Sequence, residues 1–542
     1  MNLRFLWWLL ATAPLFTAIG WATFSCGLPE SLDARAALGE MVWAPGELGS
    51  AAGGPDHVVT RALHLAALEV PGATVRSVIW LNVVCAFLLA STLLTVARRS
   101  FPAAADGPGR GLVWVAVIGM LVASPGHGCN WCYGQRVGMF LAPTLLLLGL
   151  CWLQGEGRFA LRAVAALLVA GVAPLCHTNG LAVVVALVPP LMARCRAGST
   201  VSAMAWLGAL LAVGGVATWW ALRTAGALGA ADVDFLRHVS SAPRELIGRL
   251  LTETGHAWMD LLPTTKLDEQ AMGLFSWSLP LLLMVPVGRR DAAARLQAAP
   301  WWGCLWFGLA VTLLAGFRYE LAPPIGTVRE VTYGAFLLPV GAIGLLATRF
   351  GGGFLPVAAG ALLVLGAQDW HIGLEDLRLA RMRGVHDMAT LFQEDWKPED
   401  SKARAQKLEA RSRGSVDWRK AQPEQLFELE DAGRGLVEIE LQPRGLRGHV
   451  LSSLRNPTAA WLGLVAQVDG GAPELVAEYS PRFERSGRKV WWELEVPESL
   501  FGAEAAAARV RIMAFVPEQA RVVALGPPYV VKDGSLAAAG SQ

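Results

Sequence analysis

The sequence predicts a mainly helical membrane protein, in which a polytopic transmembrane bundle precedes a soluble C-terminal β-sandwich. Two observations predict this class. Long apolar runs fill the chain before residue 370, and hydrophobic residues make up 54% of its 542 residues. Charged side chains gather afterwards: Lys266 is the only lysine before residue 390, and six lysines follow it. A helix needs about 20 mostly apolar residues to cross a hydrocarbon core of roughly 30 Å, and the first two-thirds of the chain supplies such runs repeatedly.

About eleven of these runs are candidates for membrane spans. Several are shorter than about 17 residues, and the pair around residues 176–180 could instead form a re-entrant hairpin, which would leave the parity unchanged. A cleaved signal is the alternative for the first run, but Phe24 fits a lipoprotein-like cleavage box poorly, so we expect a retained helix. The runs lie near 4–24, 77–97, 111–125, 137–154, 159–175, 179–193, 202–222, 273–287, 301–317, 331–348 and 352–369.

Arginine placement predicts the orientation of this bundle in the cytoplasmic membrane. With the N-terminus inside, every short inner loop is basic, as the positive-inside rule requires. An odd number of spans then puts the long segments 25–76 and 223–272, together with the C-terminal domain, outside. The arginines of the inner loops are Arg98, Arg99, Arg110, Arg158, Arg162, Arg194, Arg196, Arg289, Arg290, Arg295 and Arg349.

Charge and cysteine spacing exclude or weaken two classes of function. A formal net charge of +2, without a basic stripe interleaved with aromatic residues, gives no argument for a nucleic-acid partner. Cys129 and Cys132 form a Cys-x-x-Cys motif, but no second motif follows at zinc-ribbon spacing. A closed metal site would have to recruit Cys176 and His177, so a disulfide or two free thiols is the preferred interpretation and no metal is predicted.

Carboxylates of the predicted first outer loop are candidates for a general base. Glu30 and Asp33 lie just beyond the first span, and if Pro29 opens a helix they share one face near its positive end. Asp56 follows at the start of a second helical pattern. A positioned carboxylate can accept a proton from an attacking hydroxyl group. Solvation of the loop is the alternative role for each of these acids.

Cations near the predicted outer surface run against the positive-inside trend. Ion pairs with local acids such as Glu320 and Glu330 would account for them. Alternatively they bind a lipid phosphate or pyrophosphate, to which the forked guanidinium group of arginine is well suited. The candidates are Arg61, Arg136, Lys266, Arg318 and Arg329.

This pattern resembles the GT-C superfamily, membrane glycosyltransferases that use polyprenyl-phosphate-linked sugars. The resemblance is architectural and covers about residues 1–370. It lies in the acidic first outer loop, the helical pattern 57–64 with its continuation into 81–89, the turn 177–179 and the segment 318–333. Glu30 and Asp33 are separated by two residues, where the family commonly has adjacent acids.

The resemblance implies that a first-loop acid acts as base or orients the acceptor, while basic residues bind the carrier phosphate. The implied function is transfer of a sugar from a polyprenyl phosphate to an extracytoplasmic acceptor. A non-catalytic component of envelope polysaccharide assembly or export, binding the same lipid phosphate, is the alternative. Neither names a cofactor. The candidate catalytic residues are Asp33, Glu30 and Asp56, and the candidate substrate-binding residues are Arg61, Arg136, His177, Asn179, Lys266, Arg318 and Arg329.

The chain after residue 370 divides by composition into three parts. Residues 371–424 are polar with helical patches, which predicts an interfacial linker. Residues 425–534 change to a period near two, with short strands broken by turn residues, which predicts an antiparallel β-sandwich. Trp461, Trp491 and Trp492 on these strands are expected in the core rather than on a sugar-binding surface. Residues 535–542 are expected to be a disordered tail.

Overall fold

The computed structural model divides into two compact units, which are described separately. The first comprises Met1–Trp21, Val42–Ala67 and Ile79–Leu374, and the second Ala22–Met41, Leu68–Val78 and Glu375–Gln542. The residues described are 9, 12–17, 20, 58–70, 75–101, 108–125, 130–131, 136–155, 158–195, 200–224, 243–259, 266–288, 292–321, 333–350, 354, 356–364, 366–367, 370, 373–374, 377, 436–442, 445–451, 461–467, 474–479, 489–501, 508–516, 521–532 and 535–538.

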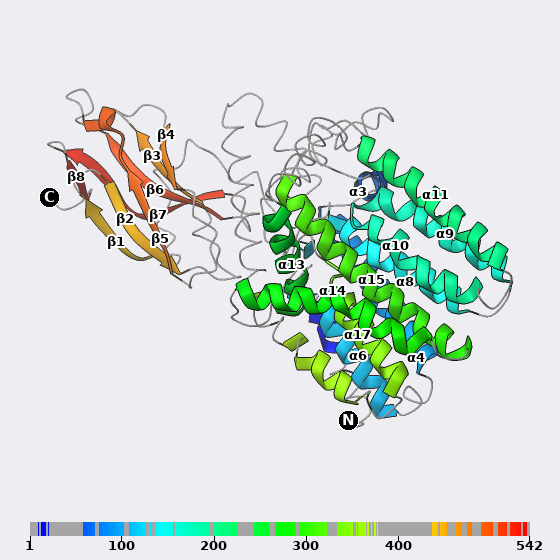
Figure 1. Ribbon diagram of the computed structural model, residues 1–542. Coiled ribbons are helices and arrows are strands. Elements are labelled where there is room, and N and C mark those ends of the chain that lie inside the picture. Colours follow the sequence, from blue (N-terminus) through cyan, green and yellow to red (C-terminus); the bar gives the residue numbers. More distant parts are fainter. Residues whose placement is uncertain are drawn as a thin grey trace. The chain divides into compact units, whose positions relative to one another are not determined.

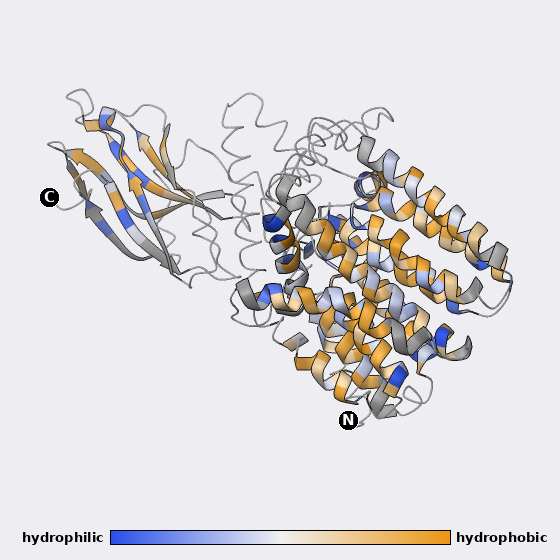
Figure 2. Ribbon diagram, in the orientation of Figure 1, coloured by the Kyte–Doolittle hydropathy of each residue, from blue (hydrophilic) through white to orange (hydrophobic). Residues whose placement is uncertain are grey.

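The first unit is a helical bundle (Figure 1), and apolar residues dominate its helices (Figure 2). Helix α15 packs along both α10 and α17, and α9 packs between α8 and α11. The helices are α3 (Val58–Glu69), α4 (Val75–Ser100), α6 (Pro108–Val122), α8 (Val137–Gln154), α9 (Phe159–Cys176), α10 (Gly180–Cys195), α11 (Thr200–Thr224), α13 (Pro243–Met259), α14 (Lys266–Gly288), α15 (Ala292–Leu321) and α17 (Leu337–Phe350).

Four stretches among the described helices are long and apolar enough to cross a membrane: Ile79–Ser100, Val137–Gln154, Phe159–Cys176 and Ala294–Ala315. Four shorter helices are also apolar. Membrane association follows from these helices, whereas the predicted count of about eleven spans stays a prediction. The shorter apolar helices are Leu112–Val122, Gly180–Ala193, Met204–Trp220 and Leu337–Phe350.

Polar contacts tie three helix ends together at what we call the basic end of the bundle, where Arg98 and Arg99 lie. The Arg99 guanidinium donates to the backbone carbonyl of Cys151 near the end of α8. Gln154 Nε2 donates to Ser100 Oγ at 3.2 Å, and the Gln297 amide donates to the Ser100 carbonyl. The C-terminal ends of α4 and α8 therefore lie beside the N-terminal end of α15, as an alternating hairpin arrangement requires.

The second unit contains two antiparallel sheets, of order β1-β2-β5 and β4-β3-β6-β7-β8. Trp461 and Trp492 are both 2% exposed, which confirms them as core residues, whereas the side chain of Trp491 lies outside what the structure describes. On β5, burial alternates from Trp492 to Glu495, so this strand has one buried and one exposed face. The strands are β1 (Leu436–Gln442), β2 (Gly445–Leu451), β3 (Leu462–Gln467), β4 (Glu474–Tyr479), β5 (Lys489–Glu495), β6 (Arg509–Val516), β7 (Arg521–Lys532) and β8 (Ser535–Ala538).

The prediction of a disordered tail is wrong for its first four residues. Ser535–Ala538 form β8, which pairs with β7 from Lys532↔Ser535 to Tyr529↔Ala538. The two residues between the strands are Asp533 and Gly534, a dipeptide that favours a two-residue hairpin turn. This hairpin signal is easily overlooked, because residues 535–542 are rich in Ala, Gly and Ser, a composition typical of a disordered tail.

Candidate functional site

Helix α3 presents a polar face to the interior of the bundle. Thr60 and His64, four residues apart, are 5% and 6% exposed. The Thr60 hydroxyl group donates to the carbonyl of Cys176, the last residue of α9. A Cβ atom at Gly138 would lie 2.5 Å from Thr60 Oγ1, so only glycine allows α8 this close an approach to α3. The start of α8, the end of α9 and α3 therefore meet at one point.

A second group of buried polar contacts joins α4 to the segment before α8. Asn82, fully buried on α4, donates through Nδ2 to the backbone carbonyl of Asn130 at 3.0 Å. Trp131 Nε1 donates to the carbonyl of Ser124 at 2.9 Å. Because buried amide and indole groups are costly without hydrogen bonds, these contacts fix residues 130–131 against the helices.

Aromatic side chains complete this end of the bundle. The ring of Phe140 lies 4.9 Å from that of Trp131 and 4.4 Å from that of Tyr333, measured between centroids. The Tyr333 hydroxyl group donates to the carbonyl of Val122 at the end of α6, at 3.1 Å. Gly334 follows with φ +95°, a backbone conformation that favours glycine. Trp131, Phe140 and Val122, which are far from Tyr333 in the sequence, therefore lie close to it in the structure.

The predicted 177–179 turn adds two candidate residues to this region. His177 Nδ1 accepts a hydrogen bond from the backbone N–H of Asn179 at 3.0 Å. Asn179 is 4% exposed, and its Nδ2 lies 3.7 Å from the sulfur of Met139 in α8. Both residues therefore serve to shape the turn, and Asn179 faces the first turn of α8.

We call the buried polar and aromatic residues at this end the polar cluster. It lies at the end opposite the basic end, because Phe140 is in the first turn of α8 and Thr60 donates to the carbonyl of Cys176 at the end of α9. Its members come from α3, α4, α8, the turn before α10 and the segments before α8 and α17. They are Thr60, His64, Asn82, Asn130, Trp131, Phe140, Asn179 and Tyr333.

The candidate cations occupy different positions relative to this cluster. Arg61 and Arg136 are half-buried beside it, on α3 and immediately before α8. Lys266 begins α14, and Arg318 lies in the last turn of α15; only their backbone is described. Arg329 lies outside the described residues, as do all three candidate acids: Asp33, Glu30 and Asp56.

Because four outer segments hold the candidate acids, histidines and outer arginines, we expect them to line one continuous cavity: loop 25–76, the turn 126–136, the turn 176–179 and the loop 318–330. The structure describes this predicted site in part. Parts of three of these four segments lie together in the structure, namely α3, residues 130, 131 and 136, and residues 177–179. Tyr333, three residues beyond the fourth segment, joins them. Whether Asp33 and Arg318 face the same space stays a prediction.

The cysteine positions bear on the alternative of a metal site. Cys176 is buried, and its sulfur lies 3.4 Å from the carbonyl of Val172 in its own helix. Cys129 and Cys132 lie outside the described residues. Among the residues that are described, no group of three or more His, Cys, Asp or Glu side chains is placed to hold a metal ion.

Sequence reasoning missed a second polar position, on α13. Glu253 and Thr254 are 5% and 0% exposed, and Trp277 Nε1 of α14 donates to Thr254 Oγ1 at 3.1 Å. The signal was available in the sequence, since Leu246 and Leu250 precede them at helical spacing on the buried face. The sequence pattern predicts this region only as part of the long outer segment 223–272.

Comparison with known proteins adds no relative: no family model, no curated protein and no solved structure matches this chain.

Proposed function

We propose that this protein is a GT-C-type membrane glycosyltransferase that moves a sugar from a polyprenyl phosphate donor to an acceptor outside the cytoplasmic membrane. The observation that supports this most is the polar cluster, with half-buried Arg61 and Arg136 beside it, at one end of an apolar bundle. Buried polar groups are expensive in a membrane protein and commonly mark functional positions. Arginines at this depth suit the phosphate of a lipid-linked donor.

In the proposed reaction, an acceptor oxygen attacks the anomeric carbon of the donor sugar while the bond from that carbon to the phosphate oxygen breaks. The acceptor proton passes to a first-loop carboxylate, for which Asp33 is preferred over Glu30 and Asp56. The leaving lipid phosphate carries the negative charge, which Arg61, Arg136 or Arg329 would stabilise. The reaction balances without an oxidant or reductant.

The second candidate function is a non-catalytic component of envelope polysaccharide assembly or export that binds the same lipid phosphate. The separation of Glu30 from Asp33 by two residues favours it, because GT-C enzymes commonly have adjacent acids there. This function needs the cations and the polar cluster but not a general base.

The proposed architecture has about eleven spans, an inner N-terminus and an outer C-terminal β-sandwich. A C-terminal alkaline phosphatase fusion is therefore expected to be active, and a C-terminal cytoplasmic fluorescent reporter dark. The basic inner loops are the reason, since they hold one face of the bundle in the cytoplasm. An inactive phosphatase together with a fluorescent reporter would contradict this orientation.

Phosphate binding is tested with purified full-length protein and two short ligands, farnesyl phosphate and uncharged farnesol. Calorimetry is expected to show tighter binding of the phosphate. Arg61→Gln or Arg136→Gln should reduce this preference by roughly tenfold or more, because a hydrogen bond to a charged group contributes about 1.5–3 kcal/mol.

The matched control is Arg158→Gln, an exposed arginine at the start of α9 and the basic end. It should leave the preference unchanged. Equal affinity for farnesol and farnesyl phosphate in the wild type would contradict both candidate functions.

A further inference from the structure

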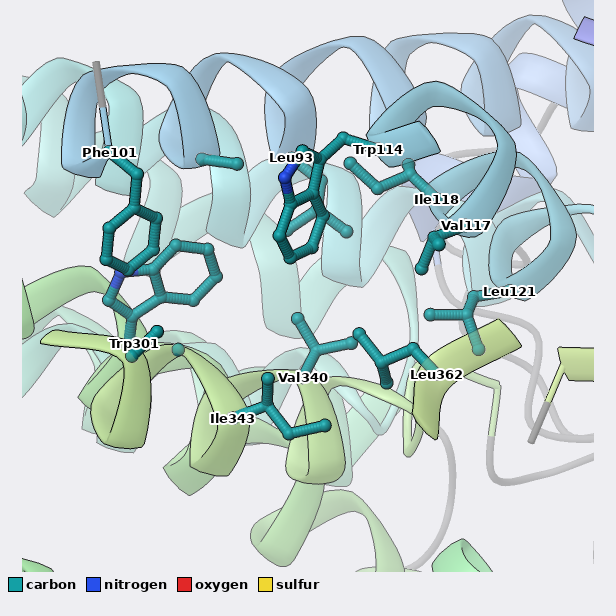
Figure 3. A pocket seen from close by; sticks show the side chains of 13 residues that line it. Leu93, Phe101, Trp114, Val117, Ile118, Leu121, Trp301, Val340, Ile343 and Leu362 are labelled. Carbon is teal, nitrogen blue, oxygen red and sulfur yellow. The ribbon is translucent and has the colours of Figure 1, made fainter. Parts of the chain in front are cut away.

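The interior of the helical unit is closely packed where α4 and α6 face α15 and α17. Figure 3 shows Trp114 and Ile118 across from Val340 and Ile343, and the cavity between these helices has a volume of about 20 Å³. That is room for about one water molecule. This cavity therefore has no space for a larger ligand, whereas helix α13 has exposed flanks that a partner can reach.

Helix α13 crosses α14 in backbone-to-backbone contact. A Cβ atom at Gly273 of α14 would collide with the carbonyl oxygen of Leu251, and a Cβ atom at Gly255 of α13 would collide with the carbonyl oxygen of Glu269. Each helix therefore needs a glycine at the crossing, because neither backbone can yield as a flexible side chain can. The crossing fixes α13 to one place along α14.

That place is near the end of α14 that is remote from the basic end. Helix α15 begins at the basic end, where Gln297 donates to the Ser100 carbonyl. Helix α14 contacts α15 and ends at Gly288, just before α15 begins at Ala292. Helix α14 therefore ends at the basic end and begins at the end that holds the polar cluster. Gly273 lies close to this beginning.

The composition of α14 places a membrane surface at the crossing. Lys266, Asp268 and Glu269 are charged, whereas residues 271–287 contain no charged side chain. This uncharged stretch extends over about 26 Å at a rise of 1.5 Å per residue, close to the roughly 30 Å of a hydrocarbon core. Helix α13 therefore crosses α14 where its uncharged stretch begins, at the boundary between hydrocarbon and headgroups.

Two contacts show how α13 is turned about its own axis. Trp277, about one turn deeper in α14 than Gly273, donates through Nε1 to Thr254 Oγ1 at 3.1 Å. On the other side of the crossing, Gln270 Nε2 donates to the Gly248 carbonyl at 3.4 Å and would lie 3.3 Å from a Cβ atom there. The flank of α13 with Thr254 therefore points toward the hydrocarbon, and the flank with Gly248 points away from it.

The exposed side chains of α13 divide between these two flanks. Ile247 is 50% exposed and lies about 20° from Thr254 around the helix, at 100° per residue. Glu245 and Arg249 are also exposed, and both lie about 160° from Ile247. Arg244, in the first turn, has a long side chain whose head can reach water from beside Ile247. An apolar flank opposite a charged flank is typical of a helix that lies in a membrane surface.

Helix α14 supplies the apolar surroundings that Ile247 needs. On the hydrocarbon side of the crossing, Leu274 and Leu281 are 61% and 70% exposed. Their exposure suits acyl chains as neighbours, because a long apolar helix in a bilayer faces lipid wherever it does not face protein. Lipid is therefore the partner expected along the same flank of α13.

We propose that α13 lies in the surface of the leaflet at the polar-cluster end, with Ile247 among the acyl chains and with Glu245 and Arg249 in the headgroup layer. The partner of this surface is the boundary between headgroups and acyl chains. The contact involves neither a sugar donor nor an acceptor, so it is independent of the proposed transfer reaction.

The test measures the depth of single side chains in the full-length protein in phosphatidylcholine nanodiscs. The amino acid p-acetylphenylalanine replaces Ile247 or Arg249, and a nitroxide is coupled to its ketone, which leaves the native cysteines unlabelled. Collisions of the nitroxide with oxygen, which concentrates in hydrocarbon, are compared with collisions with a water-soluble nickel chelate. The ratio of oxygen to nickel collisions is expected to be several-fold higher at position 247 than at position 249.

Two reference positions calibrate the ratio. Leu281 on α14 serves as the hydrocarbon reference, and Glu493, exposed on β5, serves as the water reference. Position 247 should approach the first reference, and position 249 the second. All four side chains are exposed, so no label displaces a packed residue.

Three results would overturn the proposal. A ratio at position 247 as low as at position 493 would place this flank in water. A ratio at position 249 as high as at position 281 would place the whole helix within the hydrocarbon. Few collisions with either reagent at position 247 would show that protein, rather than lipid, covers this flank.

Discussion

Asp33→Asn is expected to lower sugar transfer by about 10²–10⁴-fold, the usual loss when a general base is removed. Asparagine keeps the size of the side chain, but its amide group cannot take up the proton that the attacking hydroxyl group releases. The protein should reach wild-type levels, because we expect this residue at a wet surface rather than in the core. Envelope glycan and membrane protein level, measured in the same cells, check both parts of this expectation.

Matched variants distinguish catalysis from binding. Glu30→Gln and Asp56→Asn should have smaller effects than Asp33→Asn, and Arg329→Ala should weaken donor binding. If the protein is a non-catalytic lipid-phosphate binder, Asp33→Asn will be silent while Arg329→Ala still reduces glycan. Wild-type glycan in all three acid variants would rule out the enzyme in the form proposed.

The long helices were predictable because their signal is local. The apolar run predicted at 137–154 has the same bounds as α8, and the run predicted at 159–175 ends one residue before α9 does. Helix α14 begins at Lys266, seven residues before the predicted run 273–287, because its first two turns are polar and carry no hydropathy signal. Apolar length alone finds the part of a helix that faces lipid or core, not its polar extensions.

The strands show where local pattern was insufficient. The sequence predicts strands near 435–442, 460–468, 489–496, 508–516 and 521–525, which overlap β1, β3, β5, β6 and the first part of β7. It does not predict β2, β4 or β8. β2 (Gly445–Leu451) contains two glycines, and β4 (Glu474–Tyr479) has a glutamate near each end. These strands form because neighbours in the sheet hydrogen-bond to them on one or both sides, and that information is not local.

The site was predictable as a set of segments but not as a set of contacts. Arg61, Arg136 and the His177–Asn179 turn lie at the end of the bundle that contains the polar cluster. Thr60 and Asn82 were not selected, because a Thr on an amphipathic helix and an Asn in a span have no distinctive spacing. Their roles follow from packing of α3 and α4 against residues more than 40 positions away.

Gly308→Ala is expected to destabilise the bundle more than a typical surface substitution. A Cβ atom at Gly308 would lie 2.7 Å from the Cβ and 2.8 Å from the Cα of Leu338, which is fully buried on α17. Backbone cannot yield as the end of a flexible side chain can, so α15 and α17 must separate. Overpacking of this kind costs about 1–3 kcal/mol, while alanine recovers only about 1 kcal/mol of helix propensity.

The control is Gly208→Ala on α11, where an added Cβ atom meets nothing within 4 Å. It should keep or slightly raise the apparent Tm in detergent, because only the propensity term applies. Gly308→Ala should lower that Tm and also reduce donor binding. Donor binding should fall because α17 begins four residues after Tyr333, a member of the polar cluster that donates a hydrogen bond to Val122. Displacement of α17 would therefore move Tyr333. An unchanged Tm in Gly308→Ala would show that α15 and α17 are not in this close contact.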